Sequence, residues 1–263
     1  MYLKGIAIYP IKSLDGMMTS IAASYQGGIL GDRAFRIMRT ADGKQMNAKI
    51  EPKLIHVRTT YDGPSARIQH GKLKTRIALE MEVPGEVKFV GELEEGTGMD
   101  RILSNFLGYD VEVRGSFEER YPDDPTNPGP SVVALSTLLS VAERFSLNAE
   151  EVSRRFRPNL ILGDCEEFSE EQLVGKYFAI DEVDFEGRHV CRRCAVPTRD
   201  SRTGDVRSGF AKEFVEFRKE KGGLPVQSEN ELYRLCVRTL IIPSVLPNRI
   251  LKFFYTGSDV VVR

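Results

Sequence analysis

Short apolar runs, each ended by turn-forming residues, dominate roughly the first 90 residues of the chain. Met1–Pro10 is one such run and ends at a proline. Ala34–Arg39 and Gln45–Lys49 are two more, and they flank Asp42-Gly43, a dipeptide that favours a tight hairpin turn. This spacing is too short for helices and predicts a region built from short β-strands.

The rest of this region continues the same pattern. Leu54–Tyr61 alternates in polarity and contains β-branched residues, so we expect a strand that Asp62-Gly63-Pro64 stops. One helix is expected over Met99–Leu107. The first part of the chain is therefore predicted to be almost entirely β.

Composition shifts after Tyr121–Pro130, a segment rich in proline, aspartate and glycine that cannot form a regular element. We place a boundary there and predict two domains, 1–120 and 121–263. The fold class predicted for the whole chain is mainly β with a few helices (α+β). Helix starts are expected at Ser136 or Thr137, at Asn148 with Glu151 in a capping box, and at Ser169, and an amphipathic helix is expected over Phe210–Lys221 before Gly222-Gly223.

Charge and hydropathy exclude several classes of protein. The formal net charge of −1 gives no overall field that would attract nucleic acid or an acidic membrane. The longest apolar runs are far shorter than the ~20 residues of a membrane helix, and the first residues lack the features of a secretion signal. We therefore expect a cytoplasmic protein with no membrane or nucleic-acid partner. Its four cysteines are too sparse for a disulfide scaffold and are expected to be free thiols.

The segment Arg188–Arg207 carries the strongest chemical signal. It holds Cys191, Cys194 and six arginines, which make a positive cluster in a nearly neutral chain. Guanidinium groups bind phosphate in bidentate geometry, and a positive field favours the thiolate form of a neighbouring cysteine. A thiolate beside phosphate-binding arginines suits a soft metal carried by a phosphorylated organic cofactor.

Other interpretations of this segment stay open at the level of the residues alone. A structural zinc site needs four ligands, and beyond this pair the chain offers only single Cys165 and Cys236 with His56, His70 and His189. A redox dithiol should open a helix, which Pro197 and the turn-like Asp200–Gly204 disfavour. The cysteines could also be purely structural. An RNA-binding patch is a further alternative, although no aromatic residues are interleaved with the arginines.

Several separated segments share the pattern of one family. They are Tyr9-Pro10-Ile11-Lys12-Ser13, Gly31-Asp32-Arg33-Ala34-Phe35, Arg155-Phe156-Arg157-Pro158-Asn159, Cys191-x-Arg193-Cys194-x-x-Pro197-Thr198-x-Asp200-x-x-Thr203-Gly204 and Gly257-Ser258-Asp259-Val260. In this order they resemble the MOSC-domain proteins, a group named for the C-terminal domain of molybdenum cofactor sulfurase. The resemblance implies a MOSC β-barrel packed with an N-terminal β-barrel-like domain.

The resemblance also implies roles for individual residues. Cys194, the second cysteine of the C-x-R-C stretch, would be the catalytic residue and the protein's sulfur ligand to the molybdenum of a molybdenum–molybdopterin cofactor. Lys49 departs from the family, which often has an arginine there; lysine keeps the charge but loses the planar fork. The implied cofactor-binding residues are Lys12, Ser13 and Arg33 at the terminal phosphate, Ser136, Arg157 and Asn159 at the pterin and its phosphate, and Arg193 and Thr198 in the cysteine segment.

Two functions follow from the resemblance. Relatives such as the amidoxime-reducing component imply an oxidoreductase that removes oxygen from small N-hydroxylated substrates at a Cys-ligated molybdenum. Its electrons would come from a separate ferredoxin, flavoprotein or cytochrome, because the chain ends at Arg263 without a ferredoxin module. The alternative is a carrier that binds the cofactor, or sulfur on Cys194, without catalysis.

Overall fold

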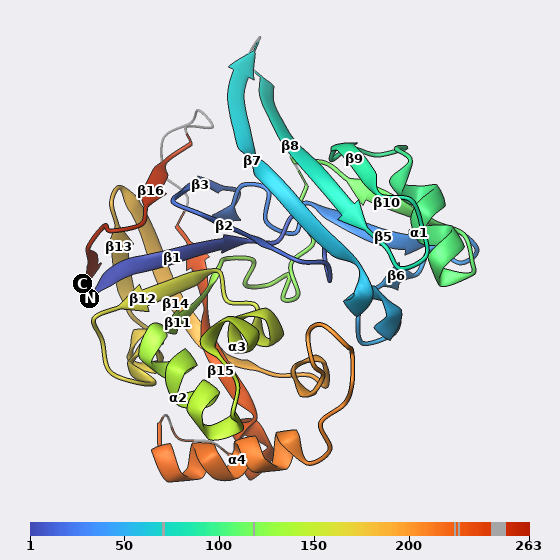
Figure 1. Cartoon of the computed structure of the whole chain (residues 1–263). Helices are drawn as coiled ribbons and strands as arrows, with labels where there is room; N and C mark the ends of the chain where they lie inside the picture. The colour runs from blue at the N-terminus through green and yellow to red at the C-terminus, as the bar shows by residue number, and fades with distance from the viewer. Residues whose placement is uncertain (70–71, 118, 224, 226, 243–250) are drawn as a thin grey trace.

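The computed structural model describes residues 1–69, 72–117, 119–223, 225, 227–242 and 251–263. Strands dominate its regular structure, and α2 (Leu135–Phe145), α3 (Ala149–Phe156) and α4 (Phe210–Lys221) gather at one end of the molecule (Figure 1). The prediction of a mainly β chain with a few helices is confirmed. No helix among the described residues is long and apolar enough to cross a bilayer.

The largest sheet combines the two ends of the chain with its middle. Its parallel pair, β11 (Ser131–Ala134) and β12 (Leu160–Gly163), is joined by the crossover through α2 and α3. β1 (Tyr2–Ile8) pairs with β12, so the first strand of the chain completes the sheet of the second half. The division of the chain at residue 120 stays a prediction. The strand order is β17 (Val260–Val262), β13 (Tyr177–Ile180), β14 (Val183–Arg192), β15 (Arg234–Ile241), β11, β12, β1 and β2 (Met17–Thr19).

Smaller sheets contain the other strands of the N-terminal half, together with Phe253–Tyr255 from near the C-terminus. β5 (Phe35–Arg39) and β6 (Gln45–Met46) make the hairpin predicted around Asp42-Gly43. α1 (Met99–Leu107) has the predicted bounds and ends at Gly108, whose φ of 84° is easy only for glycine. The remaining strands are β3 (Ile21–Tyr25), β4 (Gly28–Ile29), β7 (Arg58–Gln69), β8 (Lys72–Glu82), β9 (Phe89–Glu92), β10 (Val111–Gly115) and β16 (Phe253–Tyr255).

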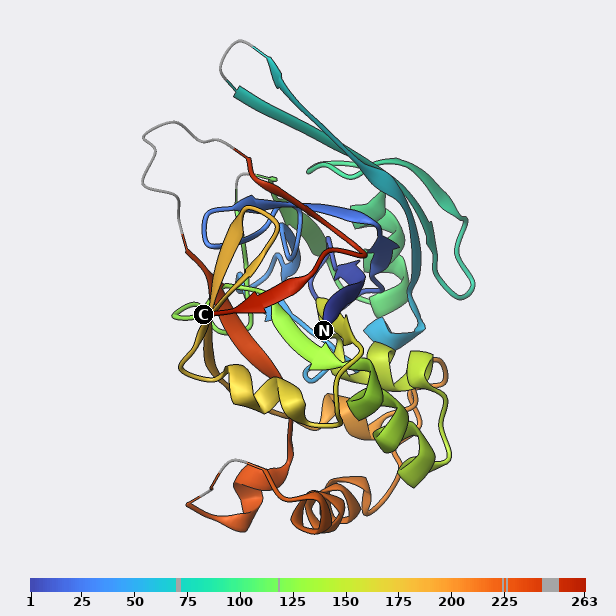
Figure 2. The same ribbon diagram turned by 90° about the vertical axis from the view of Figure 1, so that its left-hand side faces the viewer.

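The strand predicted over Leu54–Tyr61 is wrong at both ends. Pro52–His56 forms the short 3₁₀ helix η1, so β7 begins only at Arg58. It then passes through Asp62-Gly63-Pro64 without stopping, with a shift of register against β8 between Asp62 and Ser65. A bulge tolerates a proline because the missing N–H is not needed there. The resulting β7–β8 hairpin projects from the body of the molecule in both views (Figures 1 and 2).

Local capping signals were right for some helices and wrong for others. Asn148 caps α3 by accepting a hydrogen bond of 2.7 Å from the Glu151 amide, which confirms the predicted cap. The Glu151 carboxylate bonds to Arg155 and Ser201 instead of closing the predicted capping box. α2, however, begins directly after β11 with Ala134 at its N-cap, so neither Ser136 nor Thr137 caps it. The Thr137 hydroxyl bonds to buried Glu170 instead. A nearby strand end can therefore start a helix without the side-chain cap that the sequence suggested.

The last two predicted helices are those over Phe210–Lys221 and from Ser169. α4 has the predicted bounds and ends at Gly222. The helix expected to start at Ser169 is only the short 3₁₀ helix η2 (Ser169–Leu173), and its N-cap is Phe168 in a left-handed conformation rather than Ser169. Two other short 3₁₀ helices, η3 (Val196–Thr198) and η4 (Glu229–Leu232), flank α4 in the sequence.

Aromatic packing fixes α3 in place. Phe156 of α3 lies with Phe145 of α2 and with Phe210 and Phe214 of α4 in one buried cluster, and the Phe145 and Phe210 ring centroids are 4.4 Å apart. Burying each such side chain contributes about 1.5–3 kcal/mol. The C-terminal end of α3, which leads into Arg157, is therefore held on a rigid support.

Candidate functional site

A cleft of about 690 Å³ lies between the N-terminal half and the α3 side of the large sheet. Residues between 7 and 60 form one wall, and residues between 150 and 201 form the other, with Asp123 and Arg238. The fold thus brings together side chains that are far apart in the sequence. Of the nine predicted site residues, six line the cleft: Lys12, Ser13, Arg33, Arg157, Arg193 and Cys194.

Two guanidinium groups share one aromatic ring inside the cleft. The Cζ atoms of Arg33 and Arg157 lie 4.4 and 4.1 Å from the centroid of the Tyr9 ring. The Tyr9 hydroxyl donates to the Pro158 carbonyl, which fixes the ring. Burial and the neighbouring Arg33 lower the pKa of Arg157, because two cations in one poorly hydrated place repel each other.

Arg157 carries an unsatisfied donor in this place. Its Nη2 atom is buried and has no hydrogen-bond partner among the described residues. A buried donor without a partner costs about 1–3 kcal/mol, and more for a charged group. An anion in the cleft would supply the missing acceptor and would also relieve the repulsion between Arg157 and Arg33. Phosphate, which arginine binds in a bidentate manner, fits this requirement.

Arg33 is held from behind by a buried carboxylate. Its Nη1 atom lies 2.6 and 2.7 Å from the two Asp32 oxygens. Burial opposes the charge of Arg33, but Asp32 together with Asp123 and Tyr9 outweighs burial, and the pKa of Arg33 is raised. Asp32 in turn accepts hydrogen bonds of 3.0 Å from the Tyr9 amide and from Asn159 Nδ2. These hydrogen bonds hold the Asp32 carboxylate in place, and Asp32 in turn fixes the direction of the Arg33 guanidinium.

Backbone conformation is unusual at three of the predicted residues. Ser13, Arg33 and Arg157 have φ values of 75°, 51° and 52°, in the left-handed region that residues with a Cβ rarely adopt. Such strain persists where the surroundings over-determine the conformation, and it is concentrated at functional sites. All three residues line the same cleft.

Lys12 is occupied by a carboxylate of the chain itself. Its Nζ atom lies 3.1 Å from Asp123 Oδ1 and 3.4 Å from the Pro122 carbonyl oxygen. Burial opposes ionisation of Asp123, but Arg33 and Lys12 outweigh it and lower the pKa of that carboxyl to about 2. Asp123 therefore stays charged and partly neutralises the cationic cluster.

Cys194 lies beyond the end of β14 and is exposed. Its Sγ accepts a hydrogen bond of 3.5 Å from the Val196 amide at the start of η3. The preceding Arg193 donates through Nη2 to the Phe156 carbonyl at the end of α3, at 2.6 Å. The thiol is thus presented to the cleft from a loop that is tied to α3.

The other cysteines have different surroundings. Cys191 and Cys236 are buried in the core beside α2 and α4, and burial raises the pKa of Cys236. Cys191 and Cys194 thus differ in exposure, although only two residues separate them. Among the described residues, no three His, Cys, Asp or Glu side chains are grouped closely enough to hold a metal ion by themselves. His70, one candidate ligand of the zinc interpretation, lies outside the described residues.

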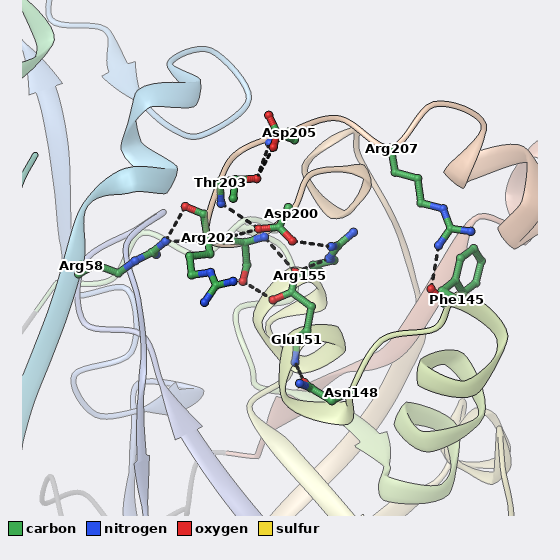
Figure 3. A network of polar contacts seen from close by, with 11 residues as sticks. Arg58, Phe145, Asn148, Glu151, Arg155, Asp200, Arg202, Thr203, Asp205 and Arg207 are labelled. Carbon is green, nitrogen blue, oxygen red and sulfur yellow. Dashed lines mark hydrogen bonds and ion pairs between the residues drawn. The ribbon is translucent and has the colours of Figure 1, made fainter.

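A network of polar contacts ties the segment after Cys194 to both walls of the cleft (Figure 3). Asp200 accepts hydrogen bonds from the amides of Arg202 and Thr203, which lower its pKa and shape a tight turn. Glu151 of α3 bonds to Ser201, and Arg58 of β7 bonds to the carbonyls of Ser201 and Arg202.

Comparison with known proteins identifies the family. The MOSC N-terminal beta barrel domain matches residues 1–110, and the MOSC domain matches residues 131–232. The chain is a MOSC-domain protein. It is 25% identical to mitochondrial amidoxime-reducing component 1 of Danio rerio over 76% of this chain and 69% of that protein. It is 24% identical to mitochondrial amidoxime reducing component 2 of Macaca fascicularis over 87% of this chain and 74% of that protein.

One solved structure is a distant match to this chain. The alignment with the YUAD protein from Bacillus subtilis covers 99% of this chain and 94% of that chain, with 10% identity and a TM-score of 0.40.

Three predicted residues of the MOSC pattern do not line the cleft. Asn159 is fully buried and supports Asp32 rather than facing the open space. The Thr198 hydroxyl donates to the Ala195 carbonyl within η3, at 2.7 Å. The Ser136 hydroxyl donates to the Cys165 carbonyl, at 2.8 Å. Their predicted contacts with a cofactor stay predictions.

Sequence reasoning missed several residues that shape this MOSC site. Tyr9 and Asp32 lie within the quoted motifs, yet neither was assigned a role. Arg238 lines the cleft from β15. The one hint in the sequence is that this arginine lies in a strand whose residues are mostly buried. Arg58 has no local signal, because its role depends on a turn that lies 143 residues further along the chain.

Proposed function

We propose that this MOSC-domain protein binds a molybdenum–pterin cofactor and reduces N-hydroxylated compounds, with Cys194 as the protein ligand to the metal. The observation that carries the proposal is the unsatisfied buried Nη2 of Arg157 beside Arg33, in the same cleft as the exposed Cys194 thiol. Both relatives named above are amidoxime-reducing components, which supports reduction as the type of reaction.

The residues of the cleft fit the chemistry of such a cofactor. Arg33, Arg157 and Lys12 would bind its phosphate, since guanidinium and ammonium groups satisfy phosphate oxygens in a partly dry site. Cys194 would bind the metal through a thiolate, the soft ligand that suits such a metal. The volume of about 690 Å³ lies within the usual range of small-molecule sites, which is about 300–1,000 Å³.

When bound, the cofactor supplies two-electron removal of the substrate's hydroxyl oxygen, which leaves as water with two protons taken up. The chain supplies positioning. Asp32 orients Arg33, the left-handed turn at Arg157 aims its guanidinium at Tyr9, and the loop contact of Arg193 with the Phe156 carbonyl sets the place of Cys194. The electrons would come from a separate electron-transfer protein.

A reductase assay tests the proposal. Protein from a host that makes the cofactor is given benzamidoxime and reduced methyl viologen, and benzamidine is measured beside Cys194→Ser and Cys165→Ser variants. We expect turnover by the wild type and by Cys165→Ser but none by Cys194→Ser. Cofactor-loaded protein without turnover would refute the reductase and favour the carrier alternative.

A further inference from the structure

The turn at Asp200–Gly204 is a small rigid unit. The Asp200 carboxylate accepts from the Arg202 and Thr203 amides at 2.9 and 2.8 Å, and the Gly204 amide donates to the Asp200 carbonyl at 3.0 Å. Gly204 has a φ of 75°, which closes the turn without strain. These internal hydrogen bonds hold the turn together, so that a displacement of one of its residues would move the whole turn.

Glu151 binds this turn from the α3 side of the cleft. Its carboxylate accepts hydrogen bonds from both the amide and the hydroxyl of Ser201, the first at 2.9 Å. Arg155, one helical turn further along α3, donates through Nε to Glu151 at 2.6 Å and reaches Asp200 at 3.4 Å. The turn is therefore docked on α3 by charge-assisted hydrogen bonds, which are stronger than neutral ones.

Arg58 binds the same turn from the opposite wall of the cleft. Its Nη2 donates to the carbonyl oxygens of Ser201 and Arg202 at 3.1 and 2.9 Å, and its Nη1 lies 3.6 Å from Asp15. Arg58 belongs to β7 in the N-terminal half, so this contact crosses between the halves (Figure 3). Ser201 is thereby held at its amide, hydroxyl and carbonyl at once.

The turn is linked to Cys194 by a short ordered path. The Val196 amide of η3 bonds to the Cys194 sulfur, and the Arg207 amide bonds to the Thr198 carbonyl at the end of η3. Arg199 pairs with Val206 across the base of the turn. Between Cys194 and Ser201 the chain thus has few free torsions, and a displacement of the turn would be transmitted to the thiol.

We propose that Arg58 and Glu151 are positioning residues that clasp the turn at Ser201 from the two walls of the cleft and so fix the Cys194 thiol between them. The inference rests on the proposed function, since Cys194 is there the metal ligand. Arg58 has a second consequence: it couples the N-terminal half, which holds Lys12 and Arg33, to the loop that holds the thiol. Phosphate contacts and metal ligation would then be set in one fixed geometry.

Limited trypsin digestion tests the clasp without any cofactor. Arg199 and Arg202 are cleavage sites within the clasped segment, and cleavage of a native loop follows the population of its open form. In the full-length cofactor-free protein, Arg58→Gln should raise cleavage there about tenfold, as expected for losing a pair of part-exposed hydrogen bonds to a charged group. Arg58→Lys should restore part of the protection. Arg154→Gln, which removes an exposed pair on α3, should change cleavage less than about twofold. Equal cleavage in wild type and Arg58→Gln would overturn the proposal.

A second measurement reads the thiol directly. A nitroxide attached to the exposed Cys194 should give a broad, immobilised spectrum in the wild type and a sharper one in both Arg58→Gln and Glu151→Gln. An unchanged spectrum in Arg58→Gln, with the loop cleaved faster, would show that the clasp holds the turn but does not position Cys194, and would refute the inference. Because neither readout uses molybdenum, the clasp can be confirmed even if the reductase assay fails. If the clasp fails while turnover is observed, only this inference is lost.

Discussion

Replacing Asn159 by alanine should destabilise the fold and disturb the anion site together. Asn159 is fully buried and makes contacts with three separate segments. Its Oδ1 accepts from the Ser131 amide and hydroxyl at 3.2 and 3.3 Å, and its Nδ2 donates to the Ala7 carbonyl and to Asp32, both at 3.0 Å. In the alanine variant all of these partners lose their hydrogen bond to Asn159 at a position closed to water.

The size of the effect follows from these contacts. Each buried group that is left unpaired costs about 1–3 kcal/mol, and Asp32 keeps its bonds to Arg33 and Tyr9, so we expect a loss of about 3 kcal/mol in the free energy of unfolding. Inorganic phosphate should also bind several times more weakly, since Asp32 orients Arg33. Asn159→Asp should be worse than alanine at neutral pH, because it places a second carboxylate beside Asp32.

Urea unfolding followed by circular dichroism measures the first effect, and calorimetric titration with phosphate measures the second. Asn105→Ala is the matched control: Asn105 makes one exposed bond of 3.4 Å to Glu86, so its loss should stay within about 0.5 kcal/mol. If Asn159→Ala loses less than about 1 kcal/mol, the reasoning about this buried network is refuted.

Three more predictions concern charge. Arg157→Met should raise the unfolding temperature of the cofactor-free protein by about 2 °C, because it removes a cation beside Arg33 whose buried Nη2 has no hydrogen-bond partner among the described residues. It should also lower phosphate affinity, and a lower unfolding temperature would contradict the reasoning. Asp123→Asn should tighten phosphate binding about three- to tenfold by freeing Lys12, whereas Asp124→Asn, which removes the same charge one residue further along, should not; equal tightening would point to a general field effect. Burial raises the pKa of Glu170 to about 7, so the folded chain keeps a proton that the unfolded chain loses above about pH 4.5, and stability should fall as the pH rises from there to about 7. Between about pH 5 and pH 8, Glu170→Gln should lose less of its free energy of unfolding than the wild type, by on the order of 1–3 kcal/mol. If the wild type and the variant lose the same amount over this range, Glu170 is not a buried, protonated carboxyl.

Local chemistry explains which parts of the fold could be predicted. α4 ends at Gly222, and α3 starts at Asn148, because a cap acts on the residues next to it. β7 could not be predicted from Asp62-Gly63-Pro64, since the strand continues only because β8 pairs with it around a bulge. The start of α2 was also missed, because β11 rather than a side-chain cap sets it.

The same distinction holds for the site. Lys12, Arg33, Arg157 and Cys194 lie in short motifs, and the fold gathers them in one cleft. Asn159 belongs to such a motif too, yet it is a buried support, and a motif cannot tell a residue that faces a ligand from one that stands behind it. Contacts such as those of Arg58 depend wholly on tertiary structure, so sequence patterns carry no signal for them.

Molybdenum content tests the central claim most directly. Wild type, Cys194→Ser and Cys165→Ser would be expressed in a host that makes the cofactor, and the metals of the purified proteins would be measured by elemental mass spectrometry. The account predicts near-stoichiometric molybdenum in the wild type and in Cys165→Ser, and a sharp loss in Cys194→Ser. Protein that contains zinc but no molybdenum in all three samples would contradict it.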